Sequence, residues 1–278
     1  MKPLMSCSRE EWRAVRGVLT DIDDTLTTDG ALAEPARQAL ERLAAAGVPV
    51  IAITGRPAGW SEPMARRWPI CGIVAENGGV LLTRERVKGA SAKETTHTLF
   101  VEFSQDADTR ARNAARLQQC AAAILAQVPG AQLATDSAGR LTDIAIDHSE
   151  HTHLAPEAIE AVCAVMRAHG LRATVSSIHI NGWIGDHNKW TAAQWAVPRL
   201  TGQAFDPDQW VYVGDSSNDQ LMFEHLPLTV AVANIERFLP VLTHRPTYIT
   251  RAERGAGFAE VVDALLAAHR PAASTPSL

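Results

Sequence analysis

Two stretches of the chain alternate short apolar runs with amphipathic helical patterns, and a stretch of a different kind separates them. The first covers residues 17–76, and the second begins at Asn188. The predicted strands in these stretches are residues 17–22, 48–54, 70–76, 210–215 and 228–232. The predicted helices are residues 34–47, 58–68, 188–199 and 257–269. Short apolar strands joined by helices are typical of a parallel sheet, so the fold class is predicted to be α/β.

Residues 84–186 between these stretches follow an α+β pattern. The predicted elements are a strand at 98–103, a helix near 106–127, strands near 131–135 and 140–147, a helix at 155–170, and strands at 171–176 and 177–183. Two helices among several sequential strands favour an antiparallel sheet covered by helices. We therefore expect a core formed by residues 1–83 and 187–278, with an inserted α+β domain at residues 84–186.

Composition limits the partners and the compartment. The 278 residues are 46% apolar, which is enough for a large core, and the formal net charge of −5 favours neither nucleic acid nor an anionic membrane as a partner. No apolar run approaches the roughly 20 residues of a membrane-spanning helix, and the N-terminus lacks the apolar region of a secretory signal. The four cysteines are far apart and form no CxxC pair, so we expect a cytoplasmic protein without disulfides or zinc. The sequence does not indicate an oligomeric state.

Polar residues follow the predicted strands of the core. Asp21, Asp23 and Asp24 come after the first strand, Thr54 ends the second, and "GDSSND" (214–219) follows the strand at 210–215. In open parallel sheets, ligands bind beyond the carboxyl ends of the strands. Asp and Asn also cap helices and form ordinary turns. Three carboxylates within four positions repel one another, however, and a bound cation would offset that repulsion.

Four motifs in this order resemble those of the haloacid dehalogenase-like (HAD) phosphohydrolase superfamily. They are DxDxT in "DIDDTLT" (21–27), a strand ending in Thr in "ITGRP" (53–57), a helix-opening lysine, Lys189, in "GDHNKWTAA" (185–193), and GDxxND in "VGDSSNDQLMF" (213–223). The position of the insertion resembles subclass IIB, which includes Cof-like, sucrose-, trehalose- and mannosyl-glycerate-phosphate phosphatases. The resemblance implies a Rossmann-like parallel-sheet core with an inserted α+β cap of the C2B type.

The resemblance also implies roles for the motif residues. Asp21 would be the nucleophile, and Asp23 would be the general acid and then the base that activates water. The residues that would bind phosphate are Thr54, Lys189 and Asn218. Mg²⁺ prefers oxygen ligands, and its expected ligands are the Asp21 and Asp215 side chains and the Asp23 backbone carbonyl. Asp219 would support the metal site or orient Lys189.

Three further residues are candidates for substrate binding. Arg56 could contact substrate or pair with a nearby carboxylate. In the predicted strand 177–183, Ile178 and Ile180 alternate with Ser177, His179 and Asn181, so one face is apolar and the other polar. That polar face, with His179 and Asn181, could look down onto the substrate or could be exposed to solvent.

The favoured function is a Mg²⁺-dependent phosphatase that hydrolyses a small phosphorylated metabolite, such as a sugar or polyol phosphate, through an aspartyl-phosphate intermediate. A phosphomutase or phosphotransferase would use the same active site and return phosphate to an organic acceptor. A non-catalytic phospho-signalling protein is a third alternative, because receiver domains also combine acidic residues, Thr and Lys on a doubly wound sheet. The complete DxDxT set and the insertion of about 100 residues argue against it.

Overall fold

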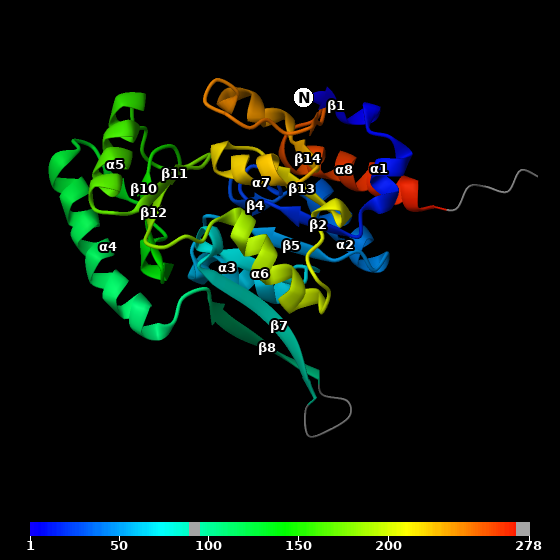
Figure 1. The fold of residues 1–278 in the computed structure, drawn as a ribbon, viewed down its shortest axis with the longest axis horizontal. Helices are drawn as coiled ribbons and strands as arrows, with labels where there is room; N and C mark the ends of the chain where they lie inside the picture. Colours follow the sequence, from blue (N-terminus) through cyan, green and yellow to red (C-terminus); the bar gives the residue numbers. More distant parts are fainter. Residues whose placement is uncertain (89–94, 271–278) are drawn as a thin grey trace, which may run out of the picture.

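The structure is a computed structural model that describes residues 1–88 and 95–270, and its largest sheet has nine strands (Figure 1). Residues 89–94 of the expected insertion and 271–278 of the expected core lie outside the described residues. The strands in spatial order are β1 (Lys2–Pro3), β15 (Tyr248–Ile249), β14 (Leu228–Ala231), β13 (Trp210–Gly214), β2 (Gly17–Thr20), β5 (Val50–Ile53), β6 (Gly72–Ala75), β7 (Val80–Lys88) and β8 (Thr95–Phe103). Pairing is parallel from β1 to β6 and antiparallel at β7 and β8. The predicted α/β class is confirmed.

Helices cover both faces of this sheet. One face packs against α1 (Arg9–Ala14), α2 (Glu34–Ala45), α3 (Ala58–Arg67) and α8 (Arg254–His269). The other packs against α6 (Lys189–Thr201) and α7 (Gln220–His225). The central strands are buried along their whole length, as expected where both faces are covered and the strands form continuous apolar runs.

A second unit, residues 107–183, lies beside the large sheet at the left of Figure 1, and we call it the cap. Its antiparallel sheet has the order β11 (Arg172–Val175), β12 (His179–Trp183), β10 (Asp143–Asp147) and β9 (Gln132–Leu133). Helices α4 (Ala107–Gln127) and α5 (Pro156–Ala168) pack on this sheet around a core of their own. The expected α+β arrangement is therefore present within residues 107–183.

One predicted strand lies in a different sheet from the one expected. Residues 98–103 were expected in the inserted domain, but they belong to β8, which pairs with β7 at the edge of the nine-stranded sheet. The hairpin extends the core sheet before the chain enters α4, as Figure 1 shows. The expectation for this strand was wrong, because an alternating strand pattern does not specify which sheet the strand joins. The division into 1–83, 84–186 and 187–278 stays a prediction.

The remaining elements are short and connect the larger ones. They are the hairpin β3 (Thr27–Thr28) and β4 (Ala31–Leu32) and the 3₁₀ turns η1 (Leu4–Ser6), η2 (Glu76–Gly78), η3 (Ser137–Gly139), η4 (Pro207–Gln209), η5 (Ser217–Asp219) and η6 (Ala233–Phe238). Turns η2 and η5 follow β6 and β13 and so lie at the carboxyl edge of the sheet. Within residues 1–88 and 95–270, every helix is too short or too polar to span a bilayer.

Candidate active site

Three motif residues follow the parallel strands β2, β5 and β13. Asp21 comes directly after β2, and its backbone N–H donates to Val213 O at 2.9 Å, so the extended chain continues past the last paired strand residue. Thr54 follows β5 and Asp215 follows β13. All three side chains are buried. Because the strands are parallel, the fold places these residues at one edge of the sheet, as the sequence predicts.

Lys189 joins two carboxylates of this edge. Asn188 begins α6 with a capping box, in which its side chain accepts from Thr191 N and its backbone N–H donates to Thr191 Oγ1, and this places Lys189 at the first helical position. Lys189 Nζ donates to Asp21 Oδ1 at 2.7 Å and to Asp219 Oδ1 at 2.6 Å. Burial lowers the pKa of Lys189, but the charges of Asp21 and Asp219 outweigh burial and raise it. Lys189 is therefore a buried, fixed cation.

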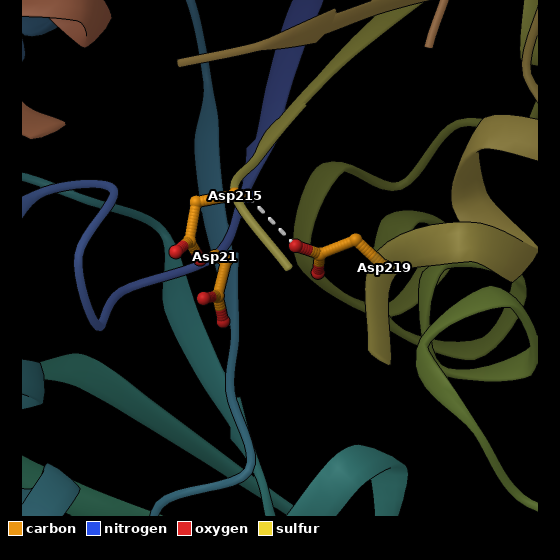
Figure 2. A group of neighbouring side chains, drawn as sticks. All are labelled: Asp21, Asp215 and Asp219. Atoms are coloured by element: carbon orange, nitrogen blue, oxygen red, sulfur yellow. Dashed lines mark hydrogen bonds between the residues drawn. The ribbon is translucent and has the colours of Figure 1, made fainter. Parts of the chain in front are cut away.

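Asp219 has both carboxylate oxygens occupied by protein donors. Oδ1 accepts from Lys189 and from the Tyr212 hydroxyl. Oδ2 accepts from the backbone N–H groups of Asp215 and Ser216 at 2.9 and 3.0 Å. Figure 2 shows the Asp219 side chain reaching the backbone of Asp215 in this way. Of the two roles expected for Asp219, the contacts favour that of orienting Lys189 and the turn that carries Asp215.

Asp215 has one occupied and one free carboxylate oxygen. Asn234 Nδ2 donates to Oδ2 at 3.0 Å, while Oδ1 is buried and has no hydrogen-bond partner among the described residues. Burial, followed by the charge of Asp21, raises the pKa of Asp215 well above its ordinary value. Burial also raises the pKa of Asp21 to about 7, although Lys189 lowers it. The two carboxylates lie side by side in Figure 2.

The donor set at this edge fits a divalent cation that prefers oxygen ligands. Carboxylate oxygens of Asp21, Asp215 and Asp219 all lie within 4.8 Å of one another. A cation there would give the free Asp215 Oδ1 a partner and would offset the repulsion that raises the carboxyl pKa values. Because Asp219 is occupied by four donors, Asp21 and Asp215 are the side chains best placed to be ligands. The expected contribution of the Asp23 backbone carbonyl stays a prediction.

Asp23 lies two residues beyond Asp21 and is held by Arg56. Arg56 Nε donates to both Asp23 oxygens, at 3.0 and 3.1 Å. Burial raises the pKa of Asp23, and Arg56 opposes that rise. Among the described residues, Arg56 is the one side chain that the structure pairs with the Asp23 carboxylate. Asp23 is therefore held separately from the Asp21–Lys189 pair.

Arg56 also connects the core to the cap. Its Nη1 donates to Asp136 at 3.2 Å and its Nη2 to Glu150 at 2.7 Å, while its guanidinium lies 4.6 Å from the Trp60 ring centre. The side chain is 5% exposed. Arg56 was expected either to contact substrate or to pair with a nearby carboxylate. The structure favours the second role, because Nε, Nη1 and Nη2 all donate to carboxylates of the chain itself.

The polar face of β12 meets the core. His179 Nε2 lies 2.9 Å from Glu150 Oε2, and the bond to His179, together with Arg56, lowers the pKa of Glu150 to about 2. Asn181 Nδ2 donates to Gly55 O at 3.1 Å and to Asp143 at 3.2 Å. Both side chains are buried, so the alternative of a solvent-exposed face was wrong. Their expected contact with substrate stays a prediction.

Thr54 and Asn218 complete the predicted phosphate-binding set. Thr54 Oγ1 accepts from Arg56 N at 3.0 Å and thus shapes the turn after β5. Asn218 Oδ1 accepts from Ser216 Oγ at 2.8 Å, which directs its amide nitrogen away from that bond. Asn218 lines a cavity together with Lys189. The structure therefore places both residues at the sheet edge that carries Asp21.

Two cavities of about 350 Å³ each lie where the core and the cap meet. The first is lined by Asp23, Arg56 and Glu150, with Ser177 from the cap and Arg237 from the core. The second is lined by Lys189 and Asn218 and by cap residues of β11 and β12. The first cavity adjoins the expected general acid, so it is the space into which a leaving group could extend.

Several residues that organise this site were missed by sequence reasoning. Glu76 is fully buried and accepts hydrogen bonds from backbone N–H groups of α3 and of the cap residues Leu141 and Thr142. Asn234 links Asp215 to the carbonyl of Asp24. The other missed residues are Asp136, Arg140, Asp143 and Glu150. An acidic residue directly after an apolar strand, as Glu76 is, was the one available signal.

Comparison with known proteins agrees with this arrangement. A family model described as haloacid dehalogenase-like hydrolase matches residues 18–127. A protein of Methanosarcina mazei named phosphoglycolate phosphatase is 27% identical over 260 residues, which cover 90% of this chain and 96% of that protein. The matched region of the family model contains DxDxT and the strand-end threonine.

Solved structures share the fold over nearly the whole chain. A Thermoplasma acidophilum protein has a TM-score of 0.66 at 16% identity, covering 91% of this chain and 98% of that one. The sucrose-phosphatase from Synechocystis, solved with sucrose and phosphate, has a TM-score of 0.61 at 16% identity, covering 90% and 98%. At these identities the likeness concerns the fold, including the core and the cap.

Proposed function

We propose that the chain is a phosphatase of the haloacid dehalogenase-like hydrolase family, subclass IIB, and that it acts as a Mg²⁺-dependent phosphomonoesterase through an aspartyl-phosphate. The observation that carries the proposal is the pairing of Asp21 with Lys189 beside the free, buried oxygen of Asp215. A carboxylate nucleophile next to a fixed cation, and beside a carboxylate oxygen that could bind a metal, suits attack on a phosphate dianion.

Asp21 and Asp215 would hold the Mg²⁺, together with the backbone carbonyl of Asp23. When bound, the ion supplies positive charge that neutralises the phosphate and orients it. Lys189 offsets charge from the other side, and Asn218 and Thr54 donate hydrogen bonds to phosphate oxygens. These groups are fixed before substrate arrives, which is how a preorganised site lowers the barrier to phosphoryl transfer.

In the first step an Asp21 oxygen attacks phosphorus, and the bond between phosphorus and the leaving alkoxide oxygen breaks. Asp23 donates its proton to that oxygen, so the alcohol leaves neutral. The products are the alcohol and a phosphate ester of the Asp21 carboxyl group. Arg56 holds Asp23 at the first cavity, where the leaving alcohol would lie.

In the second step Asp23, now a carboxylate, accepts a proton from water as the water oxygen attacks phosphorus. The bond between phosphorus and Asp21 breaks, which returns Asp21 as a carboxylate and releases inorganic phosphate. Asp23 ends protonated and ready for the next cycle. The same two residues thus serve both half-reactions with atoms and charge balanced.

We propose a sugar or polyol phosphate as the substrate. Support comes from Ser149 and Ser177, hydroxyl-bearing side chains that line the first cavity, and from the fold shared with a sucrose-phosphatase. A phosphorylated hydroxy acid is the second candidate. It is favoured by Arg237 and Arg254, which line the same cavity, and by the Methanosarcina relative named phosphoglycolate phosphatase.

A panel assay tests the proposal and separates the two substrate classes. Phosphate release is measured with Mg²⁺ from p-nitrophenyl phosphate, glucose 6-phosphate, 2-phosphoglycolate and 2-hydroxyethyl phosphate. The last two differ in a carboxylate against a neutral alcohol, so their ratio of kcat/KM reports on recognition of a second anionic group. Release of phosphate in less than stoichiometric amounts, with a phosphorylated product, would favour a phosphomutase, and no turnover of any ester would favour a signalling protein.

A further inference from the structure

The turn that joins β5 to α3 carries Thr54 and Arg56, and the residues directly after β6 hold it in place. Glu76 donates its backbone N–H to Arg56 O at 3.0 Å, and its side-chain Oε1 accepts from Ala58 N at 3.0 Å. Asn77, the next residue, donates its backbone N–H to Thr54 O at 2.9 Å. The backbone of this β5–α3 turn is therefore fixed both before and after the Arg56 side chain.

The Glu76 carboxylate also binds the cap. Its two oxygens accept from Leu141 N at 3.0 and 3.1 Å, and Oε2 accepts from Thr142 N and Thr142 Oγ1 at 2.6 Å each. Glu76 is fully buried, and Thr142 is 7% exposed. A carboxylate is stable in the interior of a protein when hydrogen-bond donors surround it in this way. One side chain thus joins the β5–α3 turn of the core to Leu141 and Thr142 of the cap.

This part of the cap packs closely against the core. A Cβ atom on Gly59 of α3 would lie 3.0 Å from Gly139 Cα of the cap. A Cβ atom on Gly79 would lie 2.2 Å from Thr142 Oγ1. A side chain at Gly59 or Gly79 would push the cap away from the core, so the close approach requires glycine at both positions. The Glu76 carboxylate therefore meets the cap at a closely fitted contact.

The backbone of Glu76 has a conformation that its contacts must maintain. Its φ is 52°, in the left-handed region that a residue with a Cβ atom rarely adopts. Such conformations persist where the surrounding structure holds them, and they are frequent near functional sites. Glycine would adopt this φ without strain but would supply no carboxylate. The hydrogen bonds of the Glu76 side chain therefore offset the strain of its backbone.

The cap contacts the β5–α3 turn at a second place. Gly55 O accepts from Arg140 Nη1 at 3.0 Å and from Asn181 Nδ2 at 3.1 Å, and both donors belong to the cap. Gly55 directly precedes Arg56, whose guanidinium pairs with two further carboxylates of the cap. The position of Arg56 thus depends on the cap through its backbone as well as through its side chain.

We propose that Glu76 is a positioning residue, which makes the placement of Arg56, and through it of Asp23, depend on the docking of the cap. The proposal rests on the proposed function, in which Asp23 donates a proton to the leaving oxygen. When the cap moves away, its donors leave the Glu76 carboxylate, and the β5–α3 turn loses an anchor next to Arg56. Proton donation by Asp23 is then efficient while the cap covers the site and inefficient while the site is open to water.

Two variants of the full-length chain test this coupling. Thr142→Val removes a donor of the cap at nearly constant volume and leaves the β5–α3 turn unchanged. Glu76→Gln keeps the shape of the side chain, but because both oxygens accept from backbone N–H groups, either orientation of the amide turns its NH₂ group toward such a donor. Thr229→Val is the matched control, because Thr229 is buried in β14 and its hydroxyl bonds to Thr247.

The readout is kcat/KM with Mg²⁺ for phenyl phosphate and p-nitrophenyl phosphate, which differ by one nitro group. Phenolate is the poorer leaving group and gains more from a proton donor. Glu76→Gln should lower kcat/KM for phenyl phosphate by on the order of 10–30-fold and for p-nitrophenyl phosphate by less than about threefold. Thr142→Val should show the same pattern with a loss of roughly 3–10-fold on phenyl phosphate. Thr229→Val should lower Tm but leave the ratio of the two values within about twofold of the wild type.

A ratio within twofold of the wild type in both Glu76→Gln and Thr142→Val would overturn the proposal. A variant that is merely less stable loses the same fraction of activity on both esters, so a purely structural role of Glu76 leaves the ratio unchanged. If Glu76→Gln does not fold, as judged by circular dichroism, Thr142→Val decides alone by the same criterion.

Hydrogen–deuterium exchange separates failure of this proposal from failure of the proposed function. In Thr142→Val, backbone amides of residues 54–58 should exchange roughly threefold faster or more, whereas in Thr229→Val they should exchange at the wild-type rate. Exchange of residues 54–58 at the wild-type rate in Thr142→Val would overturn the coupling, whether or not the chain hydrolyses an ester. Faster exchange in a chain that hydrolyses neither ester would keep the coupling and refute the phosphatase.

Discussion

Replacement of Arg56 by glutamine is the perturbation whose consequences follow most directly from the contacts. Arg56 is buried and is paired with Asp23, Asp136 and Glu150 at 3.0, 3.2 and 2.7 Å. Two of these carboxylates keep other partners in the variant, since Asp136 also pairs with Arg140 and Glu150 with His179. Asp23 keeps none among the described residues. The cost of Arg56→Gln is therefore concentrated on Asp23.

Removal of one partner from a buried ion pair destabilises a protein by about 3–5 kcal/mol. Asp23 is 14% exposed and can take up a proton, so we expect the lower end, about 3 kcal/mol. For a chain of this length that corresponds to a fall in Tm of roughly 6–12 °C. Arg66→Gln is the matched control, because its pair with Glu62 is about half exposed on both sides and such pairs contribute about 0–1 kcal/mol.

Kinetics then separate a loss of stability from a loss of positioning. General acid catalysis contributes about 10²–10⁴-fold when the leaving group needs a proton. Glycerol 2-phosphate has a poor leaving group, whereas p-nitrophenolate leaves without full protonation. If Arg56 positions Asp23, then Arg56→Gln at a temperature where it is folded should lower kcat for glycerol 2-phosphate by on the order of 10–100-fold and for p-nitrophenyl phosphate by less than about fivefold.

Two results would refute this reasoning. A Tm change no larger than that of Arg66→Gln would mean that the buried pairs contribute no more than an exposed one. Equal losses of kcat on the two substrates would mean that Arg56 does not act through the proton that Asp23 donates. Both measurements use the same purified variants, so neither result depends on identifying the natural substrate.

Four further outcomes are expected. Asp21→Asn should abolish turnover and leave the fold intact by circular dichroism, because the amide is nearly isosteric but cannot form the phosphate ester; activity within a few-fold of the wild type would remove Asp21 as the nucleophile. EDTA should abolish activity and Mg²⁺ should restore it, and full activity in metal-free protein verified by elemental analysis would contradict the metal site. His179→Ala and Asn181→Ala should lower kcat/KM for the natural substrate by on the order of 10–100-fold, and for p-nitrophenyl phosphate by less; equal losses on both would indicate a defect in cap docking. The pKa of Glu150 is lowered from 4.5 to about 2, so its carboxylate stabilises the fold above about pH 4.5, and this contribution is lost as the pH falls toward 2. The free energies of unfolding of the wild type and Glu150→Gln, measured in urea, should therefore converge in acid. A difference that stays constant with pH would show that the ion pairs of Glu150 do not titrate with folding.

The position of Asp21, Thr54 and Asp215 at one edge of the core sheet could be predicted because these residues lie in short local motifs at the ends of parallel strands. Asp21 and Lys189 are 168 positions apart, yet their hydrogen bond follows from the strand order and the start of α6. An apolar strand of a parallel sheet is buried, and a polar residue directly after it lies at the carboxyl edge of the sheet. Asp215 and Thr54 are placed by the same rule.

The contacts between core and cap follow no such rule. Arg56 meets Asp136 and Glu150 across 80 and 94 positions, and both acidic residues lie outside the cap strands and helices. A carboxylate in such a segment has the same local sequence pattern whether it is solvated or paired. A buried Arg56 guanidinium without partners would raise the free energy of the folded state, so the fold has to supply carboxylates for it. This cost arises only once the cap is docked on the core.

The strand β12 shows how much the alternation of apolar and polar residues can predict about the surroundings of side chains. The pattern of Ile178, Ile180 and the polar residues between them predicts two faces, and the structure buries Ile180 among the cap helices. Alternation gives the relative orientation of side chains along one strand but contains no information on what faces the polar side. Asn181 donates to Gly55 O at 3.1 Å because the polar face of β12 meets the loop after β5. The Gly55 carbonyl lies in the turn between Thr54 and Arg56, and it accepts from Asn181 of β12. The polar face of β12 and the loop after β5 therefore constrain each other, and a substitution on either should change how the cap docks on the core.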